Sequence, residues 1–299
     1  MWPVDRVRTL RHNYGLRNGL QRELKLQTRK LFRRVSRRRL IRDLYTLGIR
    51  PGDAVFIHLA LTEIGYVPGG PATVIAALKT VVGDMGTVVM PAYPAGGVTF
   101  DYVKRQPIFD VRHTPTALGA VPETFRQQSG TVRSLHPTHS VCAWGRHARF
   151  LIEGHERSEV PFGPGTAFRK FVDLGGRELI IGESVHFSIL RVVEDARSDY
   201  PLPVYRPEPF ALDVVDADGK RHTVITKVHS PVIAPYRNPH LVMPGLRAKG
   251  LVHEGHVGYA RAYVIDCRNL LPALSELTDE GHLAFRITPA EYSRLHGGR

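Results

Sequence analysis

Short apolar runs alternate with turns and a helical pattern in the middle of the chain. Residues 54–58 and 87–90 have the continuous apolar character of buried strands, and residues 71–82 between them have the spacing of a helix. A glycine-rich loop at 65–70 precedes the helix, and a turn at 83–86 follows it. This order predicts a βαβ unit, so we expect an α/β fold with a largely parallel central sheet flanked by helices.

Later segments add to this body. Residues 179–182 (LIIG) have the pattern of another buried strand, which leads into a helix that contains Glu194 and Asp195. Residues 210–215 and 221–226 read as two short strands around the turn sequence DADG. We therefore expect a small β-hairpin region beside the α/β body.

The first 42 residues differ from the rest in both pattern and charge. Residues 1–42 contain 14 Lys and Arg against 2 Asp and Glu, whereas residues 43–299 contain 27 against 26. Basic residues crowd the faces of a predicted amphipathic helix over about 16–47, whose apolar positions are Leu16, Leu20, Leu24, Leu31 and Val35. We divide the chain into a basic N-terminal arm, 1–42, and an α/β domain, 43–299.

Such an arm has three interpretations. Its apolar face can dock on the chain's own body, it can bind an anionic membrane surface through residues 16–42, or it can bind nucleic acid. Aromatic residues for base stacking are sparse, with only Phe32 and Tyr45 in this region, so nucleic acid is the weakest of the three.

The overall composition narrows the class of protein. With 299 residues, 42% hydrophobic and 23% charged, the chain can bury a substantial core and is not of a disordered class. Cys142 and Cys267 are far apart in sequence, which favours a reducing compartment over a disulfide framework. The chain has no apolar run of about 18 residues and no pattern of a secretory leader. We expect a cytoplasmic protein, or one that the arm places peripherally at a membrane.

No glycine motif of the dinucleotide or nucleoside triphosphate type is present. The candidate catalytic residues are mostly histidines. His136 and His139 are separated by Pro137, which argues against a helical metal pair, so we expect no metal. One of these two histidines is a candidate general base or substrate contact. His58 ends a predicted strand, which is where open α/β sheets place ligands.

Seven blocks in order resemble those of the aminoglycoside N3-acetyltransferase family, over about residues 40–275. The blocks are at 47–53, 65–70, 83–91 (GDMGTVVMP), 109–125 (FDVRHTPTALGAVPETF), 133–145 (RSLHPTHSVCAWG), 161–165 (PFGPG) and 175–182 (GGRELIIG). The basic arm is not part of the resemblance. The resemblance implies transfer of an acetyl group from acetyl-CoA to an amine, on an amino sugar or a similar small metabolite.

The resemblance also implies a site for the co-substrate. CoA is anionic, so its phosphates need backbone N–H groups and cations. We expect acetyl-CoA to bind between Gly69 and Gly70, which precede the 71–82 helix, and the segment that contains Arg133, Ser134 and Ser140.

One position departs from the family pattern where the chemistry is expected. The family's His-x-x-Glu motif contains its base histidine. Here Glu194 matches the glutamate, but Arg191 stands where histidine is expected. Arginine stays protonated and cannot accept a proton at neutral pH. His186 lies five residues earlier and can reach the same space.

Three interpretations of this departure remain open. In the first, another histidine (His186, His139 or His58) is the base of an active enzyme. In the second, Arg191 binds an anionic acceptor, and the substrate is not a standard aminoglycoside. In the third, Arg191 pairs with Glu194, and the protein is a CoA-binding pseudoenzyme or a membrane- or nucleic-acid-associated binding protein.

Overall fold

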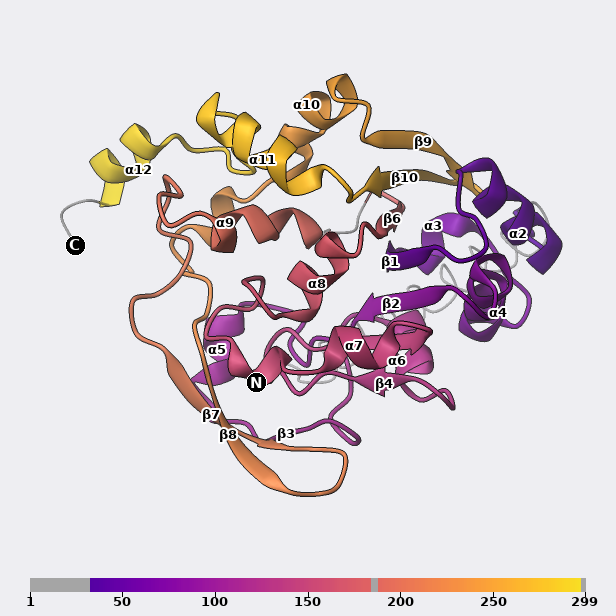
Figure 1. Cartoon of the computed structure of the whole chain (residues 1–299), viewed down its shortest axis with the longest axis horizontal. Helices are drawn as coiled ribbons and strands as arrows, with labels where there is room; N and C mark the ends of the chain where they lie inside the picture. Colours follow the sequence, from indigo (N-terminus) through magenta and orange to yellow (C-terminus); the bar gives the residue numbers. More distant parts are fainter. Residues whose placement is uncertain (1–32, 184–187, 297–299) are drawn as a thin grey trace, which may run out of the picture.

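A seven-stranded sheet forms the centre of the structure (Figure 1). The computed structural model describes residues 33–183 and 188–296. From one edge to the other, the strands are β4 (Val132–Arg133), β5 (Val141–Gly145), β2 (Thr87–Pro91), β1 (Ala54–Leu59), β6 (Arg177–Ile181), β10 (Ala260–Asp266) and β9 (Val252–Val257). Strands β1, β2 and β6 are buried along nearly their whole length, which accounts for their continuous apolar runs.

The sheet is mixed, so the expectation of a largely parallel sheet is wrong. β1 pairs in parallel with β2 and with β6, whereas the other four pairings in the described sheet are antiparallel. Helix-containing connections between the three central strands allow their parallel arrangement. In contrast, β9 and β10 are joined by a tight turn at Gly258, which makes them antiparallel neighbours.

The predicted βαβ unit is confirmed. α4 (Gly70–Val82) connects β1 to β2, and the two strands pair in parallel. The helix follows Gly69, whose φ of 77° lies in the left-handed region that favours glycine. Its apolar face packs against the sheet through buried side chains that include Val74, Ile75, Leu78 and Val81.

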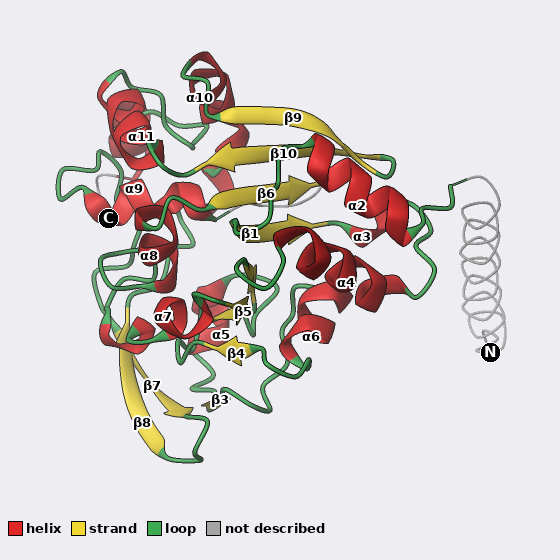
Figure 2. Cartoon of the chain, turned by 45° about the vertical axis from the view of Figure 1, so that its right-hand side comes forward, coloured by secondary structure: helices red, strands yellow, loops and turns green. Residues whose placement is uncertain are grey.

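Helices cover both faces of the sheet (Figure 2). Side chains alternate along β1, so Val55 and Ile57 join one buried cluster and Phe56 joins another. The first cluster includes residues of α2 (Arg37–Thr46), α3 (Leu61–Ile64), α4 and α6 (Ala120–Arg126). The second cluster includes residues of α7 (Ala148–Ile152), α8 (Ala167–Asp173), α9 (Val192–Ala196), α10 (Met243–Ala248) and α11 (Leu270–Asp279). The result is a three-layer α/β/α body.

The predicted hairpin is also confirmed. β7 (Phe210–Val215) and β8 (Arg221–Thr226) pair in antiparallel fashion, and β3 (Phe109–Asp110) joins β7 in parallel to give a three-stranded sheet. This sheet projects from the body at the lower edge of Figure 1. The short helices α5 (Thr99–Val103) and α12 (Pro289–His296) lie outside the two main helix layers.

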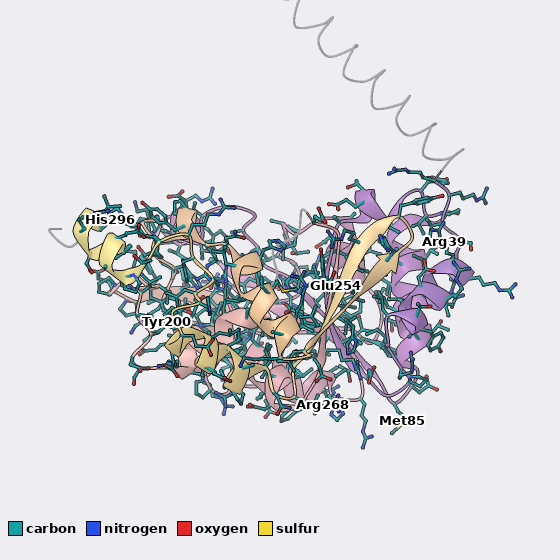
Figure 3. The ribbon with its side chains drawn as sticks, turned by 90° about the horizontal axis from the view of Figure 1, so that it is seen from above. Arg39, Met85, Tyr200, Glu254, Arg268 and His296 are labelled. Atoms are coloured by element: carbon teal, nitrogen blue, oxygen red, sulfur yellow. The ribbon has the colours of Figure 1, made fainter. Side chains whose placement is uncertain are left out.

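The described end of the basic arm is docked on the body (Figure 3). Arg39 Nη2 donates a 2.8 Å hydrogen bond to the Gly258 carbonyl, and the Gly258 N–H donates to the Asp43 carboxylate at 2.9 Å. The Arg39 guanidinium also lies 4.6 Å from the centre of the Tyr259 ring. Val35 is fully buried and belongs to the same apolar cluster as α4.

The prediction of one helix over 16–47 is wrong across residues 33–36. Ser36 has an extended backbone and caps α2 by accepting a hydrogen bond from the Arg39 N–H, so the helix begins at Arg37. Residue 42 lies inside α2. The positions Leu16, Leu20, Leu24 and Leu31 lie outside the described residues. Within the described ranges, we find no helix with the length and apolar character needed to cross a bilayer.

Candidate active site

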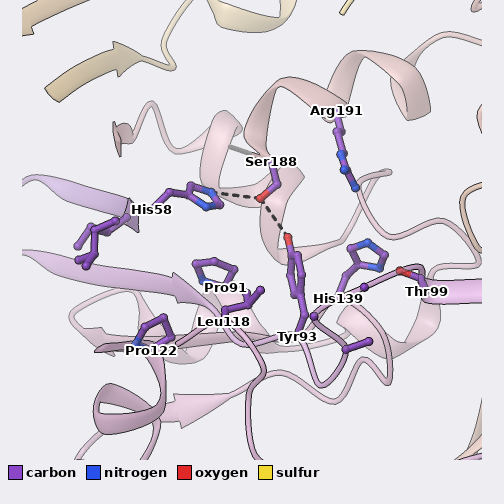
Figure 4. A pocket seen from close by; sticks show the side chains of 14 residues that line it. His58, Pro91, Tyr93, Thr99, Leu118, Pro122, His139, Ser188 and Arg191 are labelled. Carbon is purple, nitrogen blue, oxygen red and sulfur yellow. Dashed lines mark hydrogen bonds between the residues drawn. The ribbon is translucent and has the colours of Figure 1, made fainter. Parts of the chain in front are cut away.

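A pocket of about 350 Å³ opens at the carboxyl ends of the parallel strands (Figure 4). Its wall is built from the ends of β1 and β2, the loop after β2, the start of α6 and the segment that follows β6. The lining residues are Ile57, His58, Leu59, Pro91, Tyr93, Ala95, Gly96, Gly97, Thr99, Leu118, Pro122, His139, Ser188 and Arg191. This is the edge at which an open α/β sheet is expected to bind a ligand.

Three polar side chains in the wall form a hydrogen-bonded chain. The Tyr93 hydroxyl donates to Ser188 Oγ at 3.0 Å, and Ser188 Oγ lies 3.2 Å from His58 Nε2 (Figure 4). Burial raises the pKa of Tyr93 to about 12, so the phenol stays protonated and remains a donor at neutral pH. His58 itself is 7% exposed and faces the pocket from the end of β1.

A buried carboxylate lies behind His58. Glu178 on β6 is fully buried, and its Oε1 lies 3.4 Å from His58 Nε2 and accepts a hydrogen bond from the Ile189 N–H. Phe56 lies opposite Glu178 in the parallel pairing, which places His58 and Glu178 on the same face of the sheet. Glu178 was not among the candidate residues expected from the sequence. The available signal was an acidic residue inside an otherwise buried strand pattern, where an unpaired charge is costly.

A second group of histidines lies around His139. The centre of the His139 ring lies 6.0 Å from that of His136 and 5.5 Å from that of His229. The ring centres of His136 and His155 are 4.5 Å apart. Burial is the main reason that the pKa of each of these four histidines is lowered, to about 3 for His155. The positive charge of Arg191 lowers the pKa of His139 further. These side chains are therefore neutral at neutral pH.

Arg191 and Glu194 lie close together but do not pair. Glu194 accepts hydrogen bonds from both terminal nitrogens of Arg237, with Nη2 at 2.8 Å from Oε2. Arg191 lines the pocket instead, at the end of the 3₁₀ helix η2 (Ile189–Arg191), and its guanidinium lies 5.3 Å from the centre of the Phe162 ring. Glu194 lies outside the wall of this pocket. Because its two oxygens bind Arg237, the expected pairing of Arg191 with Glu194 is not observed.

The segment expected to bind CoA phosphates is engaged within the protein. Arg133 is 8% exposed and donates to Ser140 Oγ at 3.1 Å and to the carbonyls of Thr114 and Ala92. Ser140 Oγ donates to the Ala92 carbonyl, and Ser134 is fully buried. Because these donors already have acceptors, the arrangement does not favour direct contact of Arg133 with a phosphate.

Two other sets of expected site residues are not found at the pocket. Gly69 and Gly70 form the start of α4 and are not part of the pocket wall. His186 falls outside the described residues. Among the residues that the structure does describe, no group of three or more His, Cys, Asp or Glu side chains is arranged to bind a metal ion.

Comparison with known proteins decides the family. The profile described as Aminoglycoside 3-N-acetyltransferase matches residues 56–278. The chain belongs to this family. Among curated members, it is 29% identical over 257 residues to aminoglycoside N(3)-acetyltransferase VII of Streptomyces paromomycinus, covering 79% of this chain and 89% of that protein. It is 32% identical over 254 residues to aminoglycoside N(3)-acetyltransferase IX of Micromonospora chalcea, covering 78% and 89%.

Solved structures of the aminoglycoside 3-N-acetyltransferase family have the same fold. The aminoglycoside acetyltransferase AAC(3)-Xa superposes with a TM-score of 0.74 at 30% identity, covering 88% of this chain and 98% of that chain. The binary complex of AAC-IIIb with CoASH superposes with a TM-score of 0.68 at 25% identity, covering 83% and 97%. The chain is thus homologous to acetyl-CoA-dependent acetyltransferases, and its mixed sheet is that of the family.

Proposed function

We propose that this family member transfers the acetyl group of acetyl-CoA to an amine of an amino sugar or similar small metabolite, and that a standard aminoglycoside is not its acceptor. The observation that carries the proposal is the contact of His58 with Ser188 and the buried Glu178 at the pocket wall. Acetyl-CoA as the donor is supported by the family and by the complex of one relative, AAC-IIIb, with CoASH.

His58 is the general base in this proposal. An amine attacks a thioester only in its neutral form, and its nitrogen must release one further proton as the C–N bond forms, so a base in the pocket wall that accepts this proton accelerates the reaction. Glu178 Oε1 lies 3.4 Å from His58 Nε2, and this contact helps to hold the imidazole at the pocket wall, where it can accept the proton of the amine. The same carboxylate stabilises the positive charge that His58 gains in that step.

The remaining steps follow from the chemistry of a thioester. The amine nitrogen forms a bond to the carbonyl carbon, and the carbonyl oxygen becomes an oxyanion that needs hydrogen-bond donors. The Ser188 hydroxyl, which accepts a hydrogen bond from Tyr93 and can donate its own proton, is the neutral donor next to His58 in the wall. Collapse of the intermediate breaks the C–S bond, and the CoA thiolate takes the proton from His58, which leaves an amide and free CoA.

The charge of the pocket supports an acceptor other than an aminoglycoside. A relative, AAC-VIa, has been solved with sisomicin bound, and such substrates carry several protonated amines. Among the lining residues that the structure describes, none is Asp or Glu, and Arg191 is a cation. A polycation therefore meets repulsion in this pocket and finds no carboxylate to bind.

The test measures thiol release from acetyl-CoA by the full chain with a panel of amino sugars and with sisomicin. We expect turnover with an amino sugar, poor turnover with sisomicin, and a loss of about 10²- to 10⁴-fold in kcat for His58→Gln with unchanged affinity for CoA. His256→Gln, at an exposed position on β9, is the matched control. CoA binding without turnover of any amine, or full activity of His58→Gln, would overturn the proposal.

A further inference from the structure

Arg191 has an unusual environment for an arginine in a pocket wall. Its Nε is buried and makes no hydrogen bond to any residue that the structure describes. Within the same described residues, no carboxylate lies within 4 Å of its guanidinium, in contrast to Arg237, Arg126 and Arg197, which each have at least one. Burial lowers the pKa of Arg191 to about 10, so the group still carries its positive charge at neutral pH.

The two acidic side chains next to Arg191 along the chain are occupied. Both oxygens of Glu194 bind Arg237. Asp195 Oδ2 accepts hydrogen bonds from the Phe162 N–H at 2.9 Å and from the Tyr205 hydroxyl at 3.0 Å. The neighbouring partners of Arg191 are instead an aromatic ring, Phe162, and neutral histidines. Glu194 therefore acts on the charge of Arg191 only from a distance, and among the described residues no carboxylate contacts the arginine.

Arg191 is half-buried with its Nε fully enclosed, and a cation held there without a contacting anion is costly unless a ligand supplies one. The guanidinium offers five N–H donors in a planar fork that matches a carboxylate or a phosphate. Arg191 lines the same pocket as His58, so an anion bound to the arginine belongs to the molecule that occupies the pocket (Figure 4). The absence of acidic residues from the described wall leaves no competing partner for the arginine.

We propose that Arg191 binds an acidic group of the acceptor, so that the substrate is a small amine that also bears a carboxylate or a phosphate ester. The amine then reaches His58 while the acidic group binds Arg191. The role of the arginine is to orient the acceptor. This inference rests on the proposed acetyl transfer, and it names the substrate class of that reaction.

The experiment uses matched amines that differ only in the acidic group: glucosamine, glucosamine 6-phosphate and glucosaminuronic acid. Wild type should have a higher kcat/KM for one of the acidic amines than for glucosamine. In Arg191→Gln this preference should fall by about 10- to 100-fold, mainly through KM, because a charge-assisted contact is lost. Arg157→Gln, whose side chain is 78% exposed, should keep the preference and serves as the control.

Binding measurements keep this inference separate from the proposed reaction. Calorimetry with CoA present should show that an acidic amine binds wild type more tightly than Arg191→Gln, even if no acetyl group is transferred. A wild type without turnover but with this difference would remove the proposed reaction and keep the anion site. Equal binding of acidic and neutral amines would overturn the inference. So would a loss of CoA affinity in Arg191→Gln, since the arginine would then bind the co-substrate.

Discussion

Histidines meet the pocket in two regions whose electrostatics are opposite. Near the end of β1, His58 lies 3.4 Å from Glu178, a buried carboxylate close to the start of β6. On the side of the β4–β5 loop, His139 is packed among aromatic rings, and Arg191 and Arg237 are the charges that act on it. A proton on His58 is next to an anion, whereas a proton on His139 is repelled by cations. The residue type is the same, but only the first region suits a proton acceptor.

The largest expected effect is on the free energy of unfolding in acid, and it tests the region around His139. Burial lowers the pKa of His136, His139, His155 and His229 in the folded state, so below about pH 6.5 the unfolded chain binds more protons. Each histidine then costs up to about 1.4 kcal/mol of unfolding free energy per pH unit as the pH falls. Urea denaturation between about pH 7.5 and pH 5.5 should show a net loss of stability, which Asp195 partly offsets because burial raises its pKa to about 7.

A single substitution measures the share of one histidine. His155→Gln removes a titrating group whose pKa lies at about 3, and glutamine can still donate to the Pro161 carbonyl. The variant should lose less stability than wild type over the same pH interval. Identical slopes for the two proteins would show that His155 does not resist protonation in the folded state.

The next-largest expected effect is on kcat, and it tests Glu178, the carboxylate beside His58. Glu178→Gln keeps the shape of the side chain but removes the charge that stabilises protonated His58, so kcat should fall by about 10- to 100-fold. Steady-state kinetics with an amino sugar that the wild type acetylates measures this loss. Glu208→Gln, at a side chain that is 65% exposed, is the control. An unchanged kcat in Glu178→Gln would reduce Glu178 to a structural role.

The smallest effect sharpens the contrast between the two regions. His139→Gln keeps a neutral polar side chain beside Thr138 Oγ1, which lies 2.9 Å from His139 Nδ1. We expect kcat to fall by less than about 10-fold, below the range typical of a lost general base. If steady-state kinetics gave His139→Gln the same loss as His58→Gln, the assignment of the base to the carboxylate side would be wrong.

Local sequence predicted those parts of the fold that depend on local contacts. The hairpin of β7 and β8 was predicted at its observed bounds, because the DADG turn lies between its strands. The β1–α4–β2 unit was predicted for the same reason. The antiparallel flanks were missed, since β10 pairs with β6 and β5 pairs with β2 across long stretches of chain. No turn between these partners specifies their direction.

A residue of the candidate site could be predicted from the sequence only where its own position along a strand places it at the pocket. The end of β1 pointed to His58, because strand ends line the ligand crevice. Glu178 was missed because its partner is set by the register between β1 and β6, which the sequence does not state. Arg133 was expected to bind phosphate, but its donors are taken by carbonyls far away in the chain. Polarity is visible in a sequence, whereas the partner of a polar group is not.

The two edges of the central sheet have consequences for how copies of the protein meet. An exposed strand edge is a template on which another chain can pair and aggregate. β4 forms one edge and is only two residues long, which offers little backbone for pairing. β9 forms the other edge and carries the exposed polar side chains His253, Glu254 and His256. A short strand at one edge and a polar strand at the other both discourage the sheet from growing between molecules at high concentration.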